Sequence, residues 1–248
     1  MKRKLGGTIL GVIIVICFWQ LGSMLLNKSF LPTPGAAGKA FVEQLISGNL
    51  TEHFLVSTYR VVSSIFLAVL LGVPLGLLMG RSPKAAALLD PIVYLLYPLP
   101  KVVFLPIIVV LMGLGDGPKI FLITLVIFFQ IAVVTRDAAK AIPKASLQSM
   151  QSLNASRLQM YQHLIIPYCL PEILTSLRIT LGTAIAILFF AETFASFDGL
   201  GYFILEGMET RNYPEMYAGI LALAILGLLL YAIVDLIENY FCRWQEKE

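Results

Sequence analysis

Cysteine is scarce in this chain, with three residues in 248. Cys17, Cys169 and Cys242 are odd in number and widely spaced, so they outline neither a disulfide framework nor a metal-ligand cluster. We expect them to be small buried hydrophobic residues, and we expect no metal site. The chain also lacks the Gly-rich loop ending in Gly-Lys-Ser or Gly-Lys-Thr that cradles nucleotide phosphates. It is therefore not expected to hydrolyse ATP or to act as an enzyme by itself.

Charged residues are scarce as well. Asp, Glu, Lys and Arg make up 13% of the chain, against 58% hydrophobic residues and a mean hydropathy of +0.84. This composition excludes an ordinary soluble domain and places the chain in a lipid bilayer. A membrane-spanning helix needs about 20 apolar residues. Runs of this kind occur near residues 8–26, 54–80, 85–112, 120–135, 163–195 and 213–241.

The runs predict an all-α membrane protein with about six transmembrane helices. We expect one transmembrane domain over residues 1–248, with an N-terminal anchor helix at 1–30 and core helices at 54–241. Lys and Arg concentrate in the loops on the side of the N-terminus, whereas the other loops hold only Lys28, Lys39, Lys119 and Arg211. Because positively charged loops stay on the cytoplasmic side, both termini and the loop at 137–163 are predicted to be cytoplasmic.

The third apolar run contains four prolines, at positions 91, 98, 100 and 106, so it is not expected to form one straight helix. Broken helices at membrane depth occur where they are packed in protein or line a wet cavity. The segment from Tyr97 to Pro106, with Pro98, Pro100 and Lys101, is therefore a candidate pathway wall. A re-entrant packing element remains an equal alternative, and Lys101 has the alternative of snorkelling towards the membrane surface.

Ionisable residues inside a membrane are costly, which makes Arg60, Arg178 and Glu192 further candidates for the pathway or a gate. Arg178 and Glu192 are about 21 Å apart along a helix, so they are not expected to pair with each other. Arg60 and Glu192 both lie near the outer ends of their runs. We expect these two to form an ion pair, with a structural role favoured over a gate.

Gly72, Gly76 and Gly80 form a small-residue stripe that favours close helix packing. The spacing leaves open whether the partner helix belongs to the same chain or to a second copy.

The most informative segment is the polar stretch at 148–167 between two apolar runs. Its apolar residues recur every three or four positions, which predicts two short amphipathic helices. Asn154 lies where they meet; Asn tolerates the left-handed conformation that ends a helix, and Ser156 is suited to cap the next one. The sequence therefore predicts a helix, a sharp corner and a second helix on the cytoplasmic side.

This hairpin resembles the EAA loop in the membrane subunits of bacterial ATP-binding-cassette (ABC) importers. The residues at that loop's characteristic spacings are Gln148, Ser149, Met150, Asn154, Leu164, Ile166 and Pro167, of which Pro167 alone is identical to the family pattern. The resemblance extends through Leu177-Arg178-Ile179, Ala191-Glu192 and Gly199-Leu200-Gly201-Tyr202 to nearly the whole chain. These motifs are similar to permeases of the nitrate, sulfonate and taurine branch.

The resemblance implies the permease fold of a type I ABC importer, multi-pass in a bacterial or archaeal inner membrane. Two copies, as a homodimer, would surround a pathway between a cytoplasmic ATPase subunit and an extracytoplasmic solute-binding protein. ATP would bind the partner subunit, and this chain would bind no cofactor and no nucleic acid. The implied ATPase-coupling residues are Gln148, Ser149, Met150, Leu153, Asn154, Ala155, Ser156, Arg157 and Pro167.

The implied solute is a small anion such as nitrate, a sulfonate or taurine, although relatives also carry thiamine precursors and riboflavin. A secondary transporter without an ATPase is the alternative function, but no internal repeat supports it. An intramembrane aspartyl protease is disfavoured, because Asp116 of the GLGDG segment lacks a second carboxylate nearby. We interpret GLGDG as a turn between helices.

Overall fold

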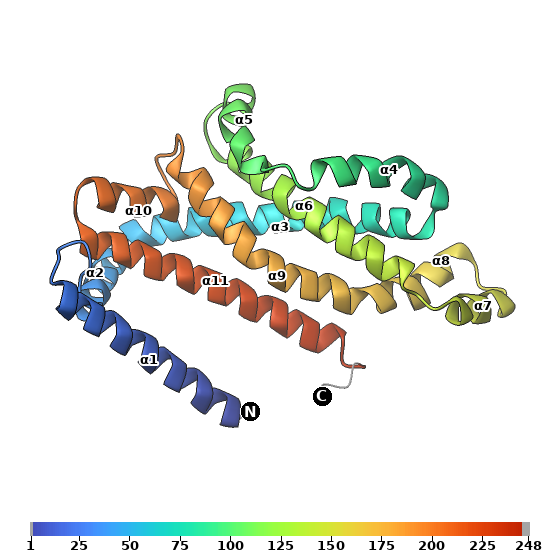
Figure 1. The fold of residues 1–248 in the computed structure, drawn as a ribbon, viewed down its shortest axis with the longest axis horizontal. Coiled ribbons are helices and arrows are strands. Elements are labelled where there is room, and N and C mark those ends of the chain that lie inside the picture. Colours follow the sequence, from blue (N-terminus) through green and yellow to red (C-terminus); the bar gives the residue numbers. More distant parts are fainter. Residues whose placement is uncertain (1, 245–248) are drawn as a thin grey trace. The chain divides into compact units, whose positions relative to one another are not determined.

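A computed structural model describes residues 2–244, with the side chains of residues 10–244. Every regular element in that range is helical, which confirms the predicted all-α class (Figure 1). The elements are α1 (Lys2–Leu26), α2 (Pro34–Ile46), α3 (Asn49–Arg81), α4 (Pro83–Leu96), the 3-10 turn η1 (Lys101–Phe104), α5 (Leu105–Met112), α6 (Asp116–Lys140), α7 (Lys144–Ser152), α8 (Arg157–Met160), the π-helical turn η2 (Tyr161–Ile165), α9 (Ile166–Thr193), α10 (Leu200–Glu209) and α11 (Tyr213–Phe241).

Four helical stretches in the described part are long and apolar enough to cross a bilayer, namely α3, α6, the stretch Arg157–Thr193 and α11. A fifth crossing is broken: α4 and the segment Lys101–Met112 are bent by 80°. This bend confirms that the proline-rich run is not one straight helix. The first predicted run does form a helix, α1, but its described apolar part, Leu10–Leu26, is shorter than the other spans.

The chain divides into two compact units. The first unit comprises Met1–Ser57 and Glu192–Leu226, and the second comprises Thr58–Ala191 and Gly227–Glu248.

In the second unit, the glycine stripe of α3 packs against α6 of the same chain. A Cβ atom added at Gly76 would lie 2.5 Å from the carbonyl oxygen of Ala132, and one added at Gly80 would lie 2.5 Å from the Cβ of Ala139. The two backbones can approach this closely only because glycine has a hydrogen atom where other residues have a side chain. The sequence left open which helix packs against the glycine stripe, and the structure shows that it is α6 of the same chain.

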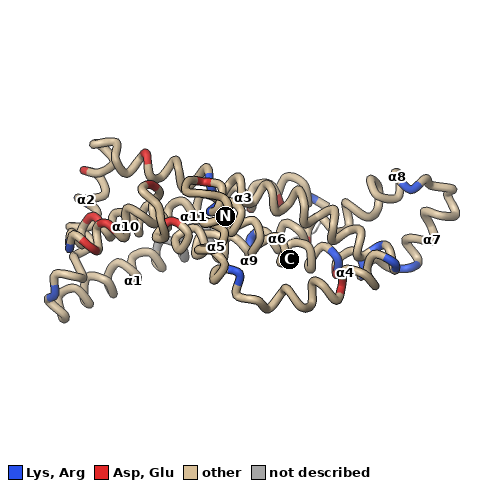
Figure 2. Tube along the Cα trace, turned by 90° about the horizontal axis from the view of Figure 1, so that it is seen from above, with Lys and Arg blue, Asp and Glu red and all other residues tan. Residues whose placement is uncertain are grey.

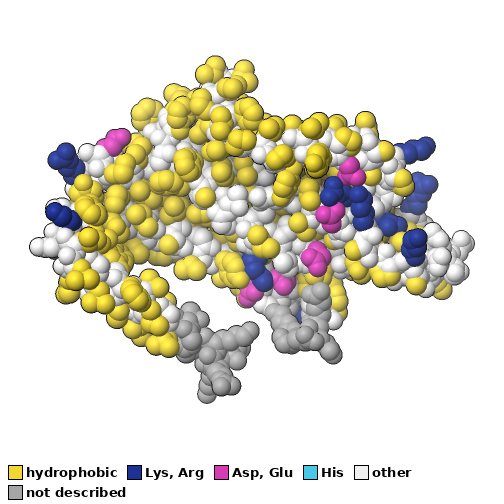
Figure 3. Space-filling model, in the orientation of Figure 1, with side chains coloured by type: hydrophobic (Ala, Val, Ile, Leu, Met, Phe, Trp, Pro, Cys, Tyr) yellow, Lys and Arg dark blue, Asp and Glu magenta, His cyan; other side chains and the backbone are white. Residues whose placement is uncertain are grey.

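Two further clusters hold the broken span in place within the second unit. Met79, Val93 and Phe129 join α3, α4 and α6, and Leu105 and Ile108 of α5 pack with Leu122 of α6. Figure 1 shows α5 lying against α6, and Figure 3 shows hydrophobic side chains covering the face over α4 and α5. An apolar exterior of this kind suits contact with lipid rather than water.

In the first unit, Trp19 of α1 holds the connection between α1 and α2 in place. The indole of Trp19 donates a hydrogen bond to the Pro32 carbonyl at 2.9 Å and stacks on Tyr217 with ring centroids 5.3 Å apart.

The expectation of three buried cysteines is wrong for Cys17, which is exposed, whereas Cys169 and Cys242 are buried. Since α1 is apolar on all sides, its sequence does not show which face the protein covers.

Candidate functional site

The predicted corner of the polar hairpin is present. Asn154 has φ of 54°, in the left-handed region. Its backbone N–H donates to the Gln151 carbonyl at 2.9 Å, and the N–H of Ala155 donates to the Met150 carbonyl at 3.1 Å. This pair of bonds is the Schellman arrangement, which satisfies the last carbonyls of a helix when the following residue is left-handed. The sequence prediction for Asn154 is confirmed.

Ser156 caps the next helix, also as predicted. Its hydroxyl accepts a hydrogen bond from the Gln159 N–H at 3.3 Å, while the Gln159 side chain accepts one from the Ser156 N–H at 2.8 Å. This reciprocal capping box holds α8 at a fixed angle to the corner. Local hydrogen bonds therefore define the corner of the hairpin.

The second hairpin helix differs from the predicted short amphipathic helix. Only Arg157–Met160 is α-helical; Tyr161–Ile165 then forms a π-helical turn that continues into α9. Pro167 offers a physical reason, because proline has no N–H to donate to His163 and its ring clashes with that residue's carbonyl in a regular α-helix. A wider turn before Pro167 relieves the clash.

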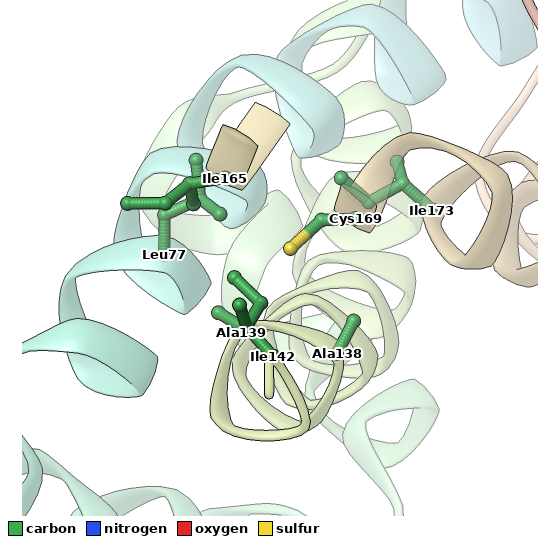
Figure 4. Close-up of a cluster of buried hydrophobic side chains, with 7 residues drawn as sticks. All are labelled: Leu77, Ala138, Ala139, Ile142, Ile165, Cys169 and Ile173. Atoms are coloured by element: carbon green, nitrogen blue, oxygen red, sulfur yellow. The ribbon is translucent and has the colours of Figure 1, made fainter. Parts of the chain in front are cut away.

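The base of the hairpin is anchored in an apolar cluster of the second unit. Figure 4 shows Leu77 of α3, Ala139 of α6, Ile165 of η2 and Cys169 and Ile173 of α9 pointing towards one another. The partly buried residues packed against this cluster include Leu147, Met160, Tyr161 and Leu164. The base of the hairpin therefore contacts α3, α6 and α9.

The tip of the hairpin is, by contrast, exposed. Leu153 is 77% exposed and Leu158 is 66% exposed, on either side of the corner. Gln148, Ser149 and Arg157 are also exposed. The remaining predicted coupling residues, Met150, Ala155 and Pro167, are half-buried, and Asn154 and Ser156 are exposed. Figure 2 shows Lys and Arg gathered around α7, α8 and the adjoining end of α4.

Arg60 is fully buried and paired within the second unit. Its Nε and a terminal nitrogen each lie 2.7 Å from Oδ1 of Asp116. Asp116 is the acidic residue of the GLGDG turn and the first residue of α6, and Gly113 and Gly115 of the turn have φ of 80° and 117°. The predicted turn is confirmed, and the ion pair anchors it to α3. The expected pairing of Arg60 with Glu192 stays a prediction.

Glu192 lies in the first unit, where it is fully buried. Both of its carboxylate oxygens accept from the Ser57 hydroxyl at 2.8 Å, and one accepts from the Gly201 N–H at 2.9 Å. The Ser57 hydroxyl oxygen also accepts from the Leu200 N–H at 2.8 Å. The carboxylate thus satisfies the Gly201 amide, the Ser57 hydroxyl satisfies the Leu200 amide, and the negative charge complements the positive end of the α10 helix dipole.

Arg178 pairs with two carboxylates on α11. One guanidinium nitrogen lies 3.1 Å from Asp235 and also bonds Glu238, while the ring of Tyr231 lies 5.4 Å from the guanidinium carbon. This network in the second unit ties α9 to α11. It also explains why two acidic residues are tolerated near the end of an apolar helix.

Lys101 stands at the break in the third span, where its ammonium serves as the cap of α4. Nζ donates to the carbonyls of Leu96 at 2.9 Å, Tyr97 at 3.0 Å and Leu99 at 3.4 Å. It also lies 4.6 Å from the centre of the Phe129 ring. Lys101 is buried rather than snorkelling. It lines a cavity together with Tyr97 and Pro100, and Pro98 lines a neighbouring one.

A family model for the inner membrane component of binding-protein-dependent transport systems matches residues 72–247. The chain belongs to this family. The taurine transport system permease TauC of Escherichia coli K12 is 33% identical over 238 residues, covering 94% of this chain and 86% of TauC. A putative aliphatic sulfonates permease, SsuC of Bacillus subtilis, is 29% identical over 98% of this chain and 90% of its own length.

A third permease relative is ThiX of Halalkalibacterium halodurans, a formylaminopyrimidine transport permease, at 26% identity over 95% of this chain and 94% of ThiX. Among solved structures, an inward-facing form of the MetNI methionine ABC transporter matches with a TM-score of 0.66 and 20% identity, covering 77% of this chain and 95% of that one. The predicted family and the type I importer fold are confirmed. The chain is a multi-pass inner-membrane permease of an ABC importer.

Sequence reasoning missed three ion-pair partners of the candidate site residues. They are Asp116, the partner of Arg60, and Asp235 with Glu238, the partners of Arg178. A signal for the last two is present, because residues three apart lie on one helix face and two carboxylates facing lipid would be too costly. Asp116 carries no such signal, since it stands in a turn that water is free to reach.

Proposed function

We propose that this permease forms the pathway of its importer as a homodimer, with an ATPase subunit bound to the α7–α8 hairpin. Both chain termini and the hairpin lie on the cytoplasmic side, and a solute-binding protein docks on the opposite side. The single observation that supports ATPase docking most strongly is the rigid exposed tip, where Leu153 and Leu158 flank the left-handed Asn154. Exposed apolar side chains on a polar hairpin mark a protein interaction site.

The ATPase provides the energy, since this chain contributes no catalytic residue, no cofactor and no nucleotide-binding loop. Nucleotide-driven closure of two ATPase subunits draws the two hairpins together. The motion reaches the membrane through the apolar cluster of Leu77, Ala139 and Cys169, because a packed core transmits displacement rather than absorbing it. Through η2 it also reaches α9 directly.

The solute is a small organic sulfonate or taurine. The relatives TauC and SsuC, named as taurine and aliphatic sulfonate transport permeases, support this choice over the formylaminopyrimidine of ThiX. Thermal unfolding of the partner binding protein with each of the three compounds tests it, because a ligand that binds the folded state raises the melting temperature. Stabilisation by the pyrimidine alone would contradict the sulfonate assignment.

The docking role is tested with Ala155→Glu, which places a bulky charge at the half-buried corner. The variant should fold normally but lose ATPase co-purification and uptake-coupled ATP hydrolysis in liposomes. Ala36→Glu is the matched control, since Ala36 is an exposed alanine near the start of α2, in the first unit, whereas the hairpin belongs to the second. Full coupling in Ala155→Glu would refute docking at this hairpin. Solute uptake by the chain without any ATPase would establish the secondary-transporter alternative instead.

A further inference from the structure

The α7–α8 hairpin carries positive charge and no negative charge. No Asp or Glu occurs between Asp137 and Glu172, whereas Lys144 and Arg157 both lie in that interval. The remaining polar surface of the hairpin comes from Gln, Ser and Asn side chains. Lys and Arg keep a loop on the cytoplasmic side, but Asp and Glu have little influence on membrane orientation. Topology therefore accounts for the cations and not for the missing carboxylates.

Ion pairing separates the cations at the base of the hairpin from those on it. Arg136 and Lys140, near the end of α6, both pair with Asp90, at 2.9 and 3.1 Å. Lys144 and Arg157 are exposed, and their side chains form no ion pair or hydrogen bond within residues 10–244, where side chains are described. The hairpin surface thus keeps two positive charges that no described carboxylate neutralises.

The two cations also stand at the less favourable ends of their helices. Lys144 is the first residue of α7, and Arg157 is the first residue of the helical stretch Arg157–Thr193. The dipole of a helix is positive at its N-terminus, so a cation there is repelled and an Asp or Glu would be favoured. Neither α7 nor α8 has an acidic residue in its first turn. Helix stability therefore does not explain where these charges are placed.

Exposed apolar side chains lie beside the charges. Leu153 and Leu158 are 77% and 66% exposed and flank the corner, and Arg157 directly precedes Leu158. Stable protein interfaces have an apolar centre with a polar rim, and charges in the rim determine which partner surface is accepted. The hairpin has both parts, and its rim carries one sign of charge only.

Two anionic surfaces exist on the cytoplasmic side, namely a protein surface rich in carboxylates and the anionic headgroups of the bilayer. Figure 1 and Figure 2 show α7 and α8 extending beyond the start of α4, of which Lys84 is the second residue. The potential of a lipid surface falls off within a Debye length, roughly 10 Å at 0.1 M salt. Lys84 is thus better placed than the hairpin tip to meet lipid, and the tip is better placed to meet protein.

We propose that the ATPase surface that receives the hairpin is acidic, with carboxylates that pair with Lys144 and Arg157 around an apolar contact to Leu153 and Leu158. The inference rests on the proposed function, in that an ATPase subunit binds this hairpin. It adds the chemistry of the partner surface, and with it a dependence of the assembly on salt. An ATPase whose corresponding surface is neutral or basic binds this permease more weakly.

The test measures binding between the full permease and its separately purified ATPase, in detergent without anionic lipid, by biolayer interferometry at low and high salt. The wild-type affinity should fall as salt rises, because exposed ion pairs are screened. Arg157→Glu should weaken binding about 2- to 30-fold at low salt, since it removes one exposed pair and adds a repulsion of similar size. The difference should shrink at high salt. Arg157→Lys keeps the charge and should bind within about 2-fold of the wild type.

Gln148→Glu is the decisive variant, because it keeps the shape of an exposed side chain and adds a negative charge one turn after Lys144. An acidic partner surface predicts weaker binding, since the new carboxylate repels that surface and pairs with Lys144. Binding that is tighter or unchanged would overturn the proposal. Lys84→Glu is the matched control, since it reverses an exposed cation of the same unit that lies outside the hairpin. It should leave the ATPase affinity unchanged.

The outcomes separate this inference from the proposed function. Undiminished binding of Arg157→Glu at low salt overturns the acidic surface but leaves docking at the hairpin intact. If Arg157→Glu keeps its ATPase affinity and instead loses thermal stabilisation by added phosphatidylglycerol, the charge serves the membrane and the acidic surface is again wrong. Docking itself is refuted only if Ala155→Glu retains full coupling.

Discussion

Gly76→Ala tests whether the contact between α3 and α6 depends on a missing side chain. The new Cβ would lie 2.5 Å from the Ala132 carbonyl oxygen, 2.6 Å from the Thr135 Cβ and 3.0 Å from the Arg136 nitrogen. Two of these three atoms belong to the backbone, so no flexible side chain can move aside. The helices must separate by about 1 Å at this level, and a gap of that size removes about a quarter to a half of each dispersion contact across it.

Overpacking of this kind costs about 1 to 3 kcal/mol, while alanine recovers about 0.5 to 1 kcal/mol over glycine inside a helix. The net loss is therefore about 0 to 2.5 kcal/mol, or about 0 to 10 °C in the melting temperature of a chain this size. Thermal unfolding of the detergent-solubilised permease, followed by size-exclusion chromatography, measures the shift.

Gly227→Ala makes the same chemical change in the interior of α11, where the added Cβ would lie an ordinary 3.9 Å from the Ile185 side chain. Its melting temperature should stay constant or rise. If Gly76→Ala is as stable as Gly227→Ala, the close approach of α3 and α6 is wrong.

Three further predictions follow from the other sites. Arg178→Met leaves the carboxylates of α11 facing each other and should cost about 1 to 2 kcal/mol, a value reduced for partial exposure; adding Asp235→Asn should restore part of the loss, and no restoration would deny the contact. In a chain without its native cysteines, an impermeant thiol reagent should label a cysteine placed at Thr210 in intact cells but not one at Ser152; the reverse pattern would invert the topology. Asn154→Gly should keep ATPase co-purification whereas Asn154→Val should reduce it, since a β-branched residue resists positive φ; equal co-purification would show that the corner is not needed.

The sequence predicted best those features that neighbouring residues determine. The left-handed Asn154 and the Ser156 cap follow from residue chemistry within one turn, and both are present. The prolines of the third run predicted a break, although Pro91 lies inside α4 and the bend comes after Leu96. Proline chemistry excludes a regular hydrogen bond, but packing decides which proline ends the helix.

Contacts between distant helices were not predictable in the same way. The pairing of Arg60 with Asp116 joins residues 56 positions apart, and it depends on the rotation of α3 about its axis. Apolar residues cover most of a membrane helix, so hydrophobic periodicity defines that rotation poorly. The sequence also gives no sign that Oε1 of Gln130 lacks a hydrogen-bond partner, because this depends on which groups pack around it.

The π-helical turn η2 determines the direction in which the hairpin points. A π turn holds one residue more than an α turn, and each residue of an α-helix advances by about 100° around the axis. The face that α8 presents is therefore rotated by about that angle from where an unbroken α9 would carry it. Removing one residue between Tyr161 and Ile165 would shorten the helical stretch Arg157–Thr193 by a single residue and still turn Leu158 to a different side. One additional residue in η2 thus determines which face of α8 the hairpin presents.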